Sequence, residues 1–140
     1  MRSERQEYFA DAWFFIALAN RFDGHHVPAR RLEAVVSRSR VVTHEAVLTE
    51  VLSHFSGGGA VVRQRAVDTV RRALGEFHVE STGGELFAVA LDLYEARRDK
   101  EYSLVDCMSM SVMRQRGITQ VLTNDHHFRQ EGFVVLSDAP

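Results

Sequence analysis

Hydrophobic positions along the chain follow two alternating patterns. Short runs rich in β-branched and aromatic residues, typical of strands, alternate with longer segments in which apolar residues recur every three or four positions, typical of helices. The predicted strands are 7–10, 40–42, 77–80, 118–123 and 133–136. The predicted helices are 12–19, 28–36, 45–55, 61–74, 85–97 and one from Leu104 that Gly117 ends. This alternation predicts a short parallel sheet covered by helices on both faces, a three-layer α/β/α architecture.

The same periodicity predicts which helical residues face the core. Thr43 should cap the third helix, and at least two of Trp13, Phe14 and Phe15 should be core residues. The inward positions of the third, fourth and fifth helices are Val47, Leu48, Val51, Leu52 and Phe55; Val62, Ala66, Val70 and Leu74; and Leu86, Val89, Ala90, Leu93 and Tyr94.

Four acidic residues occupy places where chemistry is expected in such a sheet. Asp11 directly follows the first strand, and Asp125 follows the strand 118–123. Asp106 opens a helix that is otherwise apolar around nearly its whole circumference, and Glu50 lies within two turns of the second strand. Ligands of parallel sheets collect at the carboxyl ends of the strands, near the point where the strand order reverses. The pattern therefore predicts that the four carboxylates converge there.

Each acid also has a simpler structural interpretation. Ser103-x-x-Asp106 matches a capping box. Asp11 could cap the helix that follows it, and Asp125 a short helix through 128–130. Glu50 could be an ordinary solvated glutamate of a helix surface. Whether the four side chains meet decides between capping alone and a shared site.

The length of 140 residues predicts one domain, residues 1–140, and the composition is that of a globular protein. Residues 1–6 are more charged than the first strand needs and could be disordered. The chain is 45% hydrophobic and 26% charged. It has no apolar run of the ~20 residues needed to cross a bilayer, and its charged start lacks a signal-peptide core. We therefore expect a soluble, cytoplasmic protein. The net charge of −2 argues against unspecific binding of nucleic acid over the whole surface.

Cysteine and histidine offer weaker candidates. The single Cys107 rules out an internal disulfide, and its apolar surroundings favour a core residue over a nucleophile. The pairs His25-His26 and His126-His127 suggest zinc, but adjacent histidines diverge, and no Cys or His-x-x-x-His partner completes a site. We interpret His127-Phe128 as packing between strand and helix.

Four segments together resemble the PIN-domain nucleases, and among them the VapC-type toxins of toxin–antitoxin modules. They are Asp11 followed by Ile16-Ala17-Leu18, the T-x-x-x-V-L-x-E helix from Thr43 to Glu50, Ser103-Leu-Val-Asp106-Cys, and Thr123-x-Asp125-x-His127-Phe128. The resemblance implies a metal-dependent endoribonuclease in which Asp11, Glu50, Asp106 and Asp125 hold the metal. It also implies an RNA substrate, an antitoxin protein as partner and a homodimer.

Elementary chemistry supports that implication. Clustered carboxylates repel one another, so they either retain protons or share a divalent cation. An all-oxygen site suits Mg²⁺ or Mn²⁺. Ser103, Thr123 and Asn124 could orient the acids or bind substrate phosphate, with local capping and turn formation as the alternative. One departure is Ala12, where the family usually has Ser or Thr, and this change could weaken metal binding.

Two alternatives remain open. An inactive PIN-like module could keep the acids and serve in RNA or protein recognition. A receiver-type phosphoacceptor domain also carries acids at strand ends, but it expects a late lysine, and the only lysine is Lys100. Trp13, Phe14 and Phe15 could also line an antitoxin groove or dimer surface instead of packing in the core.

Overall fold

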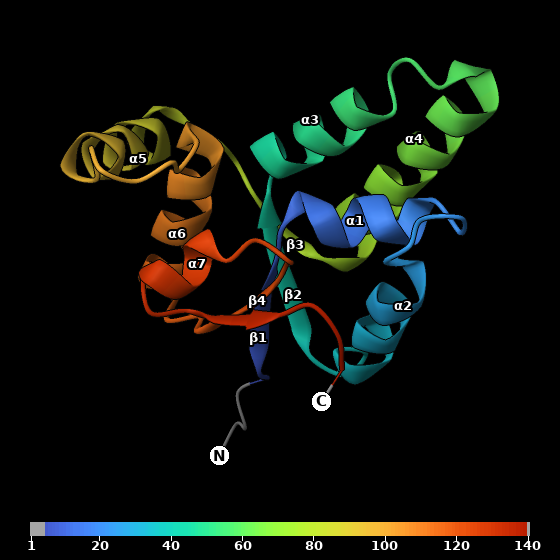
Figure 1. The fold of residues 1–140 in the computed structure, drawn as a ribbon, viewed down its shortest axis with the longest axis horizontal. Coiled ribbons are helices and arrows are strands. Elements are labelled where there is room, and N and C mark those ends of the chain that lie inside the picture. Colours follow the sequence, from blue (N-terminus) through green and yellow to red (C-terminus); the bar gives the residue numbers. More distant parts are fainter. Residues whose placement is uncertain (1–4, 140) are drawn as a thin grey trace.

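Five parallel strands form one sheet at the centre of the molecule (Figure 1). The structure is a computed structural model in which residues 5–139 are described. The strands are β1 (Glu7–Ala10), β2 (Arg40–His44), β3 (His78–Glu80), β4 (Gln120–Leu122) and β5 (Val134–Leu136). Their order across the sheet is β3-β2-β1-β4-β5, and every pairing is parallel. This confirms the predicted α/β class.

The helices lie in two groups, one on each side of the sheet (Figure 1). They are α1 (Ala12–Ala19), α2 (His26–Val35), α3 (Glu45–His54), α4 (Gly59–Glu76), α5 (Gly84–Ala96), α6 (Leu104–Arg116) and α7 (His127–Gln130). Helices α1 to α4 pack on one another, and α5 packs on α6. The chain runs outward from β1 to β3 and then returns to β4, so right-handed crossovers place the later helices on the opposite face. The strand order reverses between β1 and β4.

The core joins the sheet to the apolar faces of both helix groups. Phe9, Val42 and Val121 of the strands are fully buried. Phe14 and Phe15 of α1 are also buried, whereas Trp13 is only partly buried. This confirms that at least two of the three aromatic residues belong to the core.

The predicted cap of the third helix is wrong by one residue. Strand β2 continues to His44, which pairs with Glu80 of β3, so the helix begins one position later. His44 is the N-cap, and its Nδ1 accepts a hydrogen bond from the Val47 amide at 3.3 Å. The Thr43 hydroxyl instead donates to the Ala10 carbonyl at 2.8 Å, which ties β2 to β1.

The predicted apolar faces of α3, α4 and α5 are too wide. Leu52, Leu74, Val89 and Tyr94 are 38%, 58%, 40% and 51% exposed. The buried residues of α4 are Ala66 and Ala73, and those of α5 are Leu86 and Ala90. Helix α5 packs mainly on α6 at the periphery (Figure 1), so fewer of its apolar positions are covered.

Helix α6 matches its prediction. Ser103 and Asp106 form the capping box, and Gly117 ends the helix in the left-handed conformation with φ 70°. Cys107 is fully buried, and burial raises the pKa of its thiol to about 11. Its assignment as a core residue is therefore confirmed.

The amino terminus is described from residue 5 onward. The Gln6 carbonyl accepts a hydrogen bond of 2.9 Å from the Arg40 amide. The predicted disorder of residues 1–6 otherwise falls largely outside the described residues. Within residues 5–139, no helix has both the length and the apolar character of a membrane span.

Candidate active site

The predicted acidic residues come from elements that meet where the strand order reverses. Asp11 lies between β1 and α1, and Asp125 lies in the loop that follows β4. Asp106 is in the first turn of α6, and Glu50 is in the second half of α3. Because β1 and β4 are neighbours, the residues that follow them emerge side by side.

Thr123 links the two acids that follow the strands. Its hydroxyl is fully buried and donates a hydrogen bond of 2.8 Å to Asp11 Oδ2. The Thr123 hydroxyl oxygen also accepts a hydrogen bond of 3.1 Å from the Asp125 amide. One side chain therefore fixes both the orientation of the Asp11 carboxylate and the backbone that carries Asp125.

Capping and convergence occur together at Asp106 and Asp125. Asp106 Oδ2 accepts from the Ser103 amide at 3.0 Å, and the Ser103 hydroxyl accepts from the Asp106 amide at 3.0 Å. Asp125 Oδ1 accepts from the His127 amide at 2.9 Å, although the N-cap residue of α7 is His126. Each carboxylate keeps oxygen lone pairs that these caps do not use.

His127 is a member of this site that sequence reasoning missed. Its Nδ1 lies 3.3 Å from Asp125 Oδ1 and 3.9 Å from Asp106 Oδ2. This nitrogen is buried and makes no hydrogen bond of good geometry within residues 5–139. One donor atom from each of Asp106, Asp125 and His127 lies within 4.8 Å of the others, a spacing that could hold a metal ion.

The predicted packing role of the His127-Phe128 pair holds for Phe128, which is fully buried. His127 lies two positions after Asp125, at the start of α7, and this spacing was the available signal. The other histidine pair does not contribute, since His26 Nδ1 is 2.7 Å from the Ala17 carbonyl oxygen.

The remaining predicted residues lie around this group. Asp11 is connected to Asp125 through the side chain of Thr123. Glu50 is an exposed residue of α3, and the negative charges of Asp11 and Asp106 contribute to raising its pKa. Asn124 is exposed and makes no side-chain hydrogen bond within the part of the chain that is described. The Ser103 hydroxyl serves as the cap of α6.

The pKa values of the acids in the site are raised by burial and by the crowding of negative charge. Burial, together with the charges of Asp106 and Asp125, raises the pKa of Asp11 to about 6, even though the Thr123 hydrogen bond acts in the opposite direction. Although Glu50 as a residue is exposed, its carboxyl group is partly shielded from water, and this partial burial, with the charges of Asp11 and Asp106, raises its pKa to about 7. Burial chiefly raises the pKa of Asp106 as well. A bound cation would relieve this repulsion, so the donor set fits a divalent metal ion.

A buried hydrogen bond connects the two helix groups. His44 Nε2 lies 2.9 Å from Ser109 Oγ, and the Ser109 hydroxyl in turn donates to the Val105 carbonyl at 3.0 Å. Because His44 Nδ1 accepts from the Val47 amide, the proton of the neutral ring belongs on Nε2. This bond joins the start of α3, which carries Glu50, to α6, which carries Asp106.

Comparison with known proteins agrees with the geometry. The PIN-domain family model matches residues 8–133. The 23S rRNA-specific endonuclease VapC20 of Mycobacterium tuberculosis is 35% identical over 130 residues, which cover 90% of this chain and 95% of VapC20.

Two solved structures extend the comparison. The crystal structure of VapC20 from Mycobacterium tuberculosis, described as a sarcin–ricin loop cleaving toxin, matches with a TM-score of 0.80 and 31% identity over 91% of this chain and 96% of that one. DNA-bound VapBC from Salmonella typhimurium shares the fold with a TM-score of 0.66 and 16% identity, over 93% of this chain and 96% of that one.

The family match spans nearly the whole chain, and the relative at 35% identity aligns over almost its full length. The resemblance inferred from the acidic motifs is thereby confirmed. The chain belongs to the PIN-domain family and is a VapC-type toxin endoribonuclease.

Proposed function

We propose that this endoribonuclease cleaves ribosomal RNA with a divalent cation, Mg²⁺ or Mn²⁺, held by Asp11, Glu50, Asp106 and Asp125. The observation that carries the proposal is the convergence of carboxylates from separate elements. Burial, with a further contribution from the neighbouring negative charges, raises the pKa values of Asp11 and Glu50. Buried, crowded carboxylates are costly in a purely structural role, and a bound cation would offset both the burial of charge and the repulsion.

The donor chemistry supports Mg²⁺ or Mn²⁺. Carboxylate oxygens are the ligands these ions prefer, with further positions left for water and substrate phosphate. When bound, the cation would polarise the scissile phosphate and lower the pKa of an attacking water. His127 would add a nitrogen donor beside Asp106 and Asp125.

The chain's own residues would orient the reactants and release protons. Thr123 and Ser103 hold the Asp11 and Asp106 carboxylates in place. Without a cation, the carboxyl groups of Asp11 and Glu50 have pKa values near neutrality, so they would release protons when a cation binds at physiological pH. The exposed amide of Asn124 and the hydroxyl of Ser103 are available to donate hydrogen bonds to phosphate oxygens.

The relatives support a proposal for the substrate. VapC20 is named as specific for 23S rRNA and as cleaving the sarcin–ricin loop, and it aligns with this chain over almost its full length. We therefore propose a hairpin of 23S rRNA as the substrate, with the reaction taking place in the cytoplasm.

Partners are proposed on the same basis. The Salmonella typhimurium structure is a VapBC complex, and a chain of that complex has the same fold as this protein. We propose that a VapB-type antitoxin inhibits this endoribonuclease by covering the acidic site, and that the toxin forms a homodimer.

Cleavage of a 23S rRNA fragment by the purified chain tests the proposal. The wild type should cleave with Mg²⁺ or Mn²⁺ and not with EDTA. Asp106→Asn keeps the acceptor for the Ser103 amide and removes the charge, so it should fold normally and lose cleavage at least 100-fold. Asp92→Asn removes an exposed acid of α5 and is the matched control. Cleavage that survives Asp106→Asn would refute metal catalysis at this site, and no cleavage by the wild type would favour the inactive PIN-like module.

A further inference from the structure

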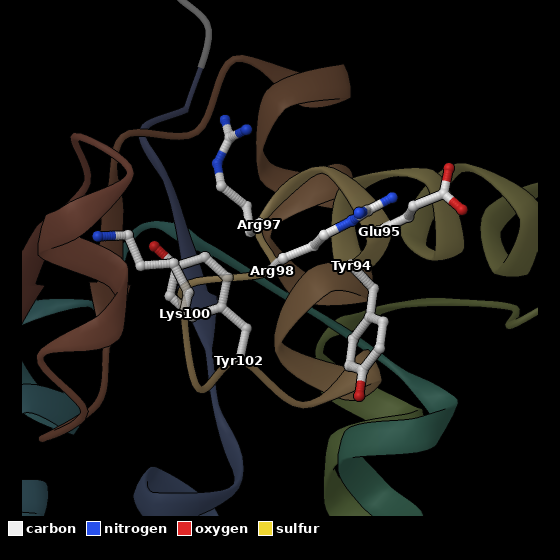
Figure 2. Close-up of a pocket in the computed structure, with 6 residues that line it drawn as sticks. All are labelled: Tyr94, Glu95, Arg97, Arg98, Lys100 and Tyr102. Carbon is white, nitrogen blue, oxygen red and sulfur yellow. The ribbon is translucent and has the colours of Figure 1, made fainter.

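A pocket of about 270 Å³ lies where α5 ends and the loop to α6 begins. Six residues line it, and Figure 2 shows their side chains around the end of that helix. They are Tyr94, Glu95, Arg97, Arg98, Lys100 and Tyr102. None of them is among the predicted site residues, and the cleavage chemistry proposed above does not use them.

Three cations and one acid, Glu95, line this pocket, so its charge is positive, and that positive charge is incompletely paired. Arg98 is exposed and makes no ion pair within residues 5–139. Lys100 Nζ lies 3.6 Å from Asp99, a side chain that is 77% exposed, and such a surface pair is weak. Arg97 binds Glu131, but Arg114 binds the same carboxylate, so this group of three keeps a net positive charge. A negatively charged ligand could therefore bind here without displacing a strong partner.

The pocket adjoins the acidic site through one of its walls. The Tyr102 ring centroid is 5.5 Å from that of His127, whose Nδ1 is 3.3 Å from Asp125. Tyr102 also directly precedes Ser103, which caps the helix of Asp106. The Tyr102 hydroxyl donates to Glu131 at 2.9 Å, which fixes this wall in place. A strand bound at the acidic site would therefore lie beside Tyr102, which also lines the pocket.

An acidic site with a basic pocket beside it suits the binding of an RNA strand. The acidic site repels backbone phosphates, so a bound strand gains most from cations placed directly beside that site. Arginine binds phosphate through its planar fork, and aromatic rings next to such cations can stack on unpaired bases. Tyr94, a residue that is 51% exposed, lines the same pocket and could supply such a surface.

We infer that the pocket formed by Arg97, Arg98 and Lys100 with Tyr94 and Tyr102 binds the sugar-phosphate backbone of the RNA substrate next to the bond that is cleaved. This inference rests on the proposed RNA-cleaving function. It assigns a binding role to the loop between α5 and α6.

Binding of a fluorescein-labelled sarcin–ricin hairpin, measured in EDTA with Asp106→Asn as the background, tests the inference. Arg98→Ala/Lys100→Ala removes two cations and leaves the Arg97–Glu131 pairing intact. It should weaken binding about tenfold at low salt. It should also reduce the slope of log K against log salt by about 0.7 for each single-strand phosphate that the variant no longer neutralises. Arg98→Lys/Lys100→Arg should retain both affinity and slope.

Arg65→Ala/Arg71→Ala is the matched control, because it removes two exposed arginines of α4, which lies on the opposite side of the sheet (Figure 1). In the active background with Mn²⁺, the pocket variant should raise KM about tenfold and change kcat less than about twofold. Thermal melting would establish that each variant is folded.

The outcomes separate this inference from the proposed function. If the wild type cleaves RNA and the pocket variant binds RNA like the control pair, the inference is overturned and the function stands. If the wild type does not cleave but the pocket variant still weakens RNA binding, the function fails and the pocket remains an RNA site. Unchanged RNA binding with loss of a co-expressed protein partner would make the pocket a protein-docking surface and would also overturn the inference.

Discussion

The hydroxyl of Thr123 donates a hydrogen bond of 2.8 Å to the carboxylate of Asp11, a residue 112 positions earlier in the chain. Both residues follow strands that are neighbours in the sheet. The bond lies at the point where the strand order reverses, and the same hydroxyl oxygen accepts from the Asp125 amide. Thr123 thus holds two of the four acids without being charged itself.

Replacing Thr123 by Val should disorder the proposed metal ligands Asp11 and Asp125 and leave the fold intact. Valine has a similar shape but cannot donate to Asp11. Loss of a group that orients metal ligands typically costs 10–100-fold in metal affinity, and we expect that range for Mn²⁺ binding measured by calorimetry. Thr123→Ser should restore binding. Thr119→Val, an exposed position just before the same strand, is the control, and equal losses in both variants would refute the assigned role.

The buried His44 should make the protein sensitive to acid. Burial lowers the pKa of His44 to about 4, so between pH 6.5 and 4 the unfolded chain binds a proton that the folded chain excludes. Stability should therefore fall as the pH drops through that range, by about 2–3 kcal/mol from this residue. His44→Asn can keep the cap of α3 and loses the bond to Ser109. We expect it to be about 1–2 kcal/mol less stable at pH 7 in urea unfolding, with a flatter pH profile.

The exposed His54 of the same helix provides the control for that measurement. His54→Asn should retain the wild-type dependence of stability on pH. A His44→Asn protein whose stability falls between pH 6.5 and 4 as steeply as the wild type would contradict the assignment.

Glu131, the C-cap residue of α7, is expected to stabilise the position of this helix through its ion pairs. Its side chain is 4% exposed and accepts hydrogen bonds from Arg97, Arg114 and Tyr102. The Arg97 hydrogen bond chiefly lowers the pKa of Glu131, to about 2. Because both arginines are partly exposed, we expect Glu131→Gln to cost about 2 kcal/mol, less than a fully buried pair. This difference should be present above pH 4.5 and shrink as the pH falls toward 2.

Urea unfolding measures the Glu131 effect, and Glu76→Gln supplies a comparison at an exposed ion pair. That variant should lose no more than about 0.5 kcal/mol. Equal losses at the two positions would show that Glu131 is no more than a surface partner.

His127 should alter which metal ions the site accepts. Imidazole nitrogen favours Zn²⁺, whereas Mg²⁺ is bound almost entirely through oxygen. We expect His127→Ala to weaken Zn²⁺ binding at least tenfold in a competition titration and Mg²⁺ binding less than about threefold. His126→Ala, at the exposed neighbouring histidine, should change neither. Equal losses of both metals in His127→Ala would indicate a structural role instead.

The sequence predicts the parts of the fold that local chemistry determines. Ser103, Asp106 and Gly117 mark the bounds of α6 because capping boxes and left-handed glycines depend on neighbouring residues alone. The motifs around Asp11 and Asp125 also point to the correct edge of the sheet, since the carboxyl ends of parallel strands must meet.

Features that depend on packing between elements could not be read in the same way. Threonine is a common N-cap residue, which led to the prediction for Thr43. Pairing with β3 extends β2 to His44, however, and moves the start of the helix. Tyr94 fits an apolar helical stripe, yet α5 lies at the periphery and leaves the ring half exposed. His127 resembles a packing residue until the loop after β4 brings its Nδ1 beside Asp106. Each of these outcomes depends on a partner distant in sequence.

Calorimetric titration of Mn²⁺ into the metal-free protein tests the central claim, that these carboxylates share one cation. The wild type should bind more tightly as the pH rises from 5.5 to 7.5, because protons leave Asp11 and Glu50, with pKa values of about 6 and 7, and cease to compete. Asp106→Asn should weaken binding at least tenfold, while Asp92→Asn should match the wild type. Equal Mn²⁺ affinity in Asp106→Asn and the wild type, or an affinity that does not change with pH, would contradict the account.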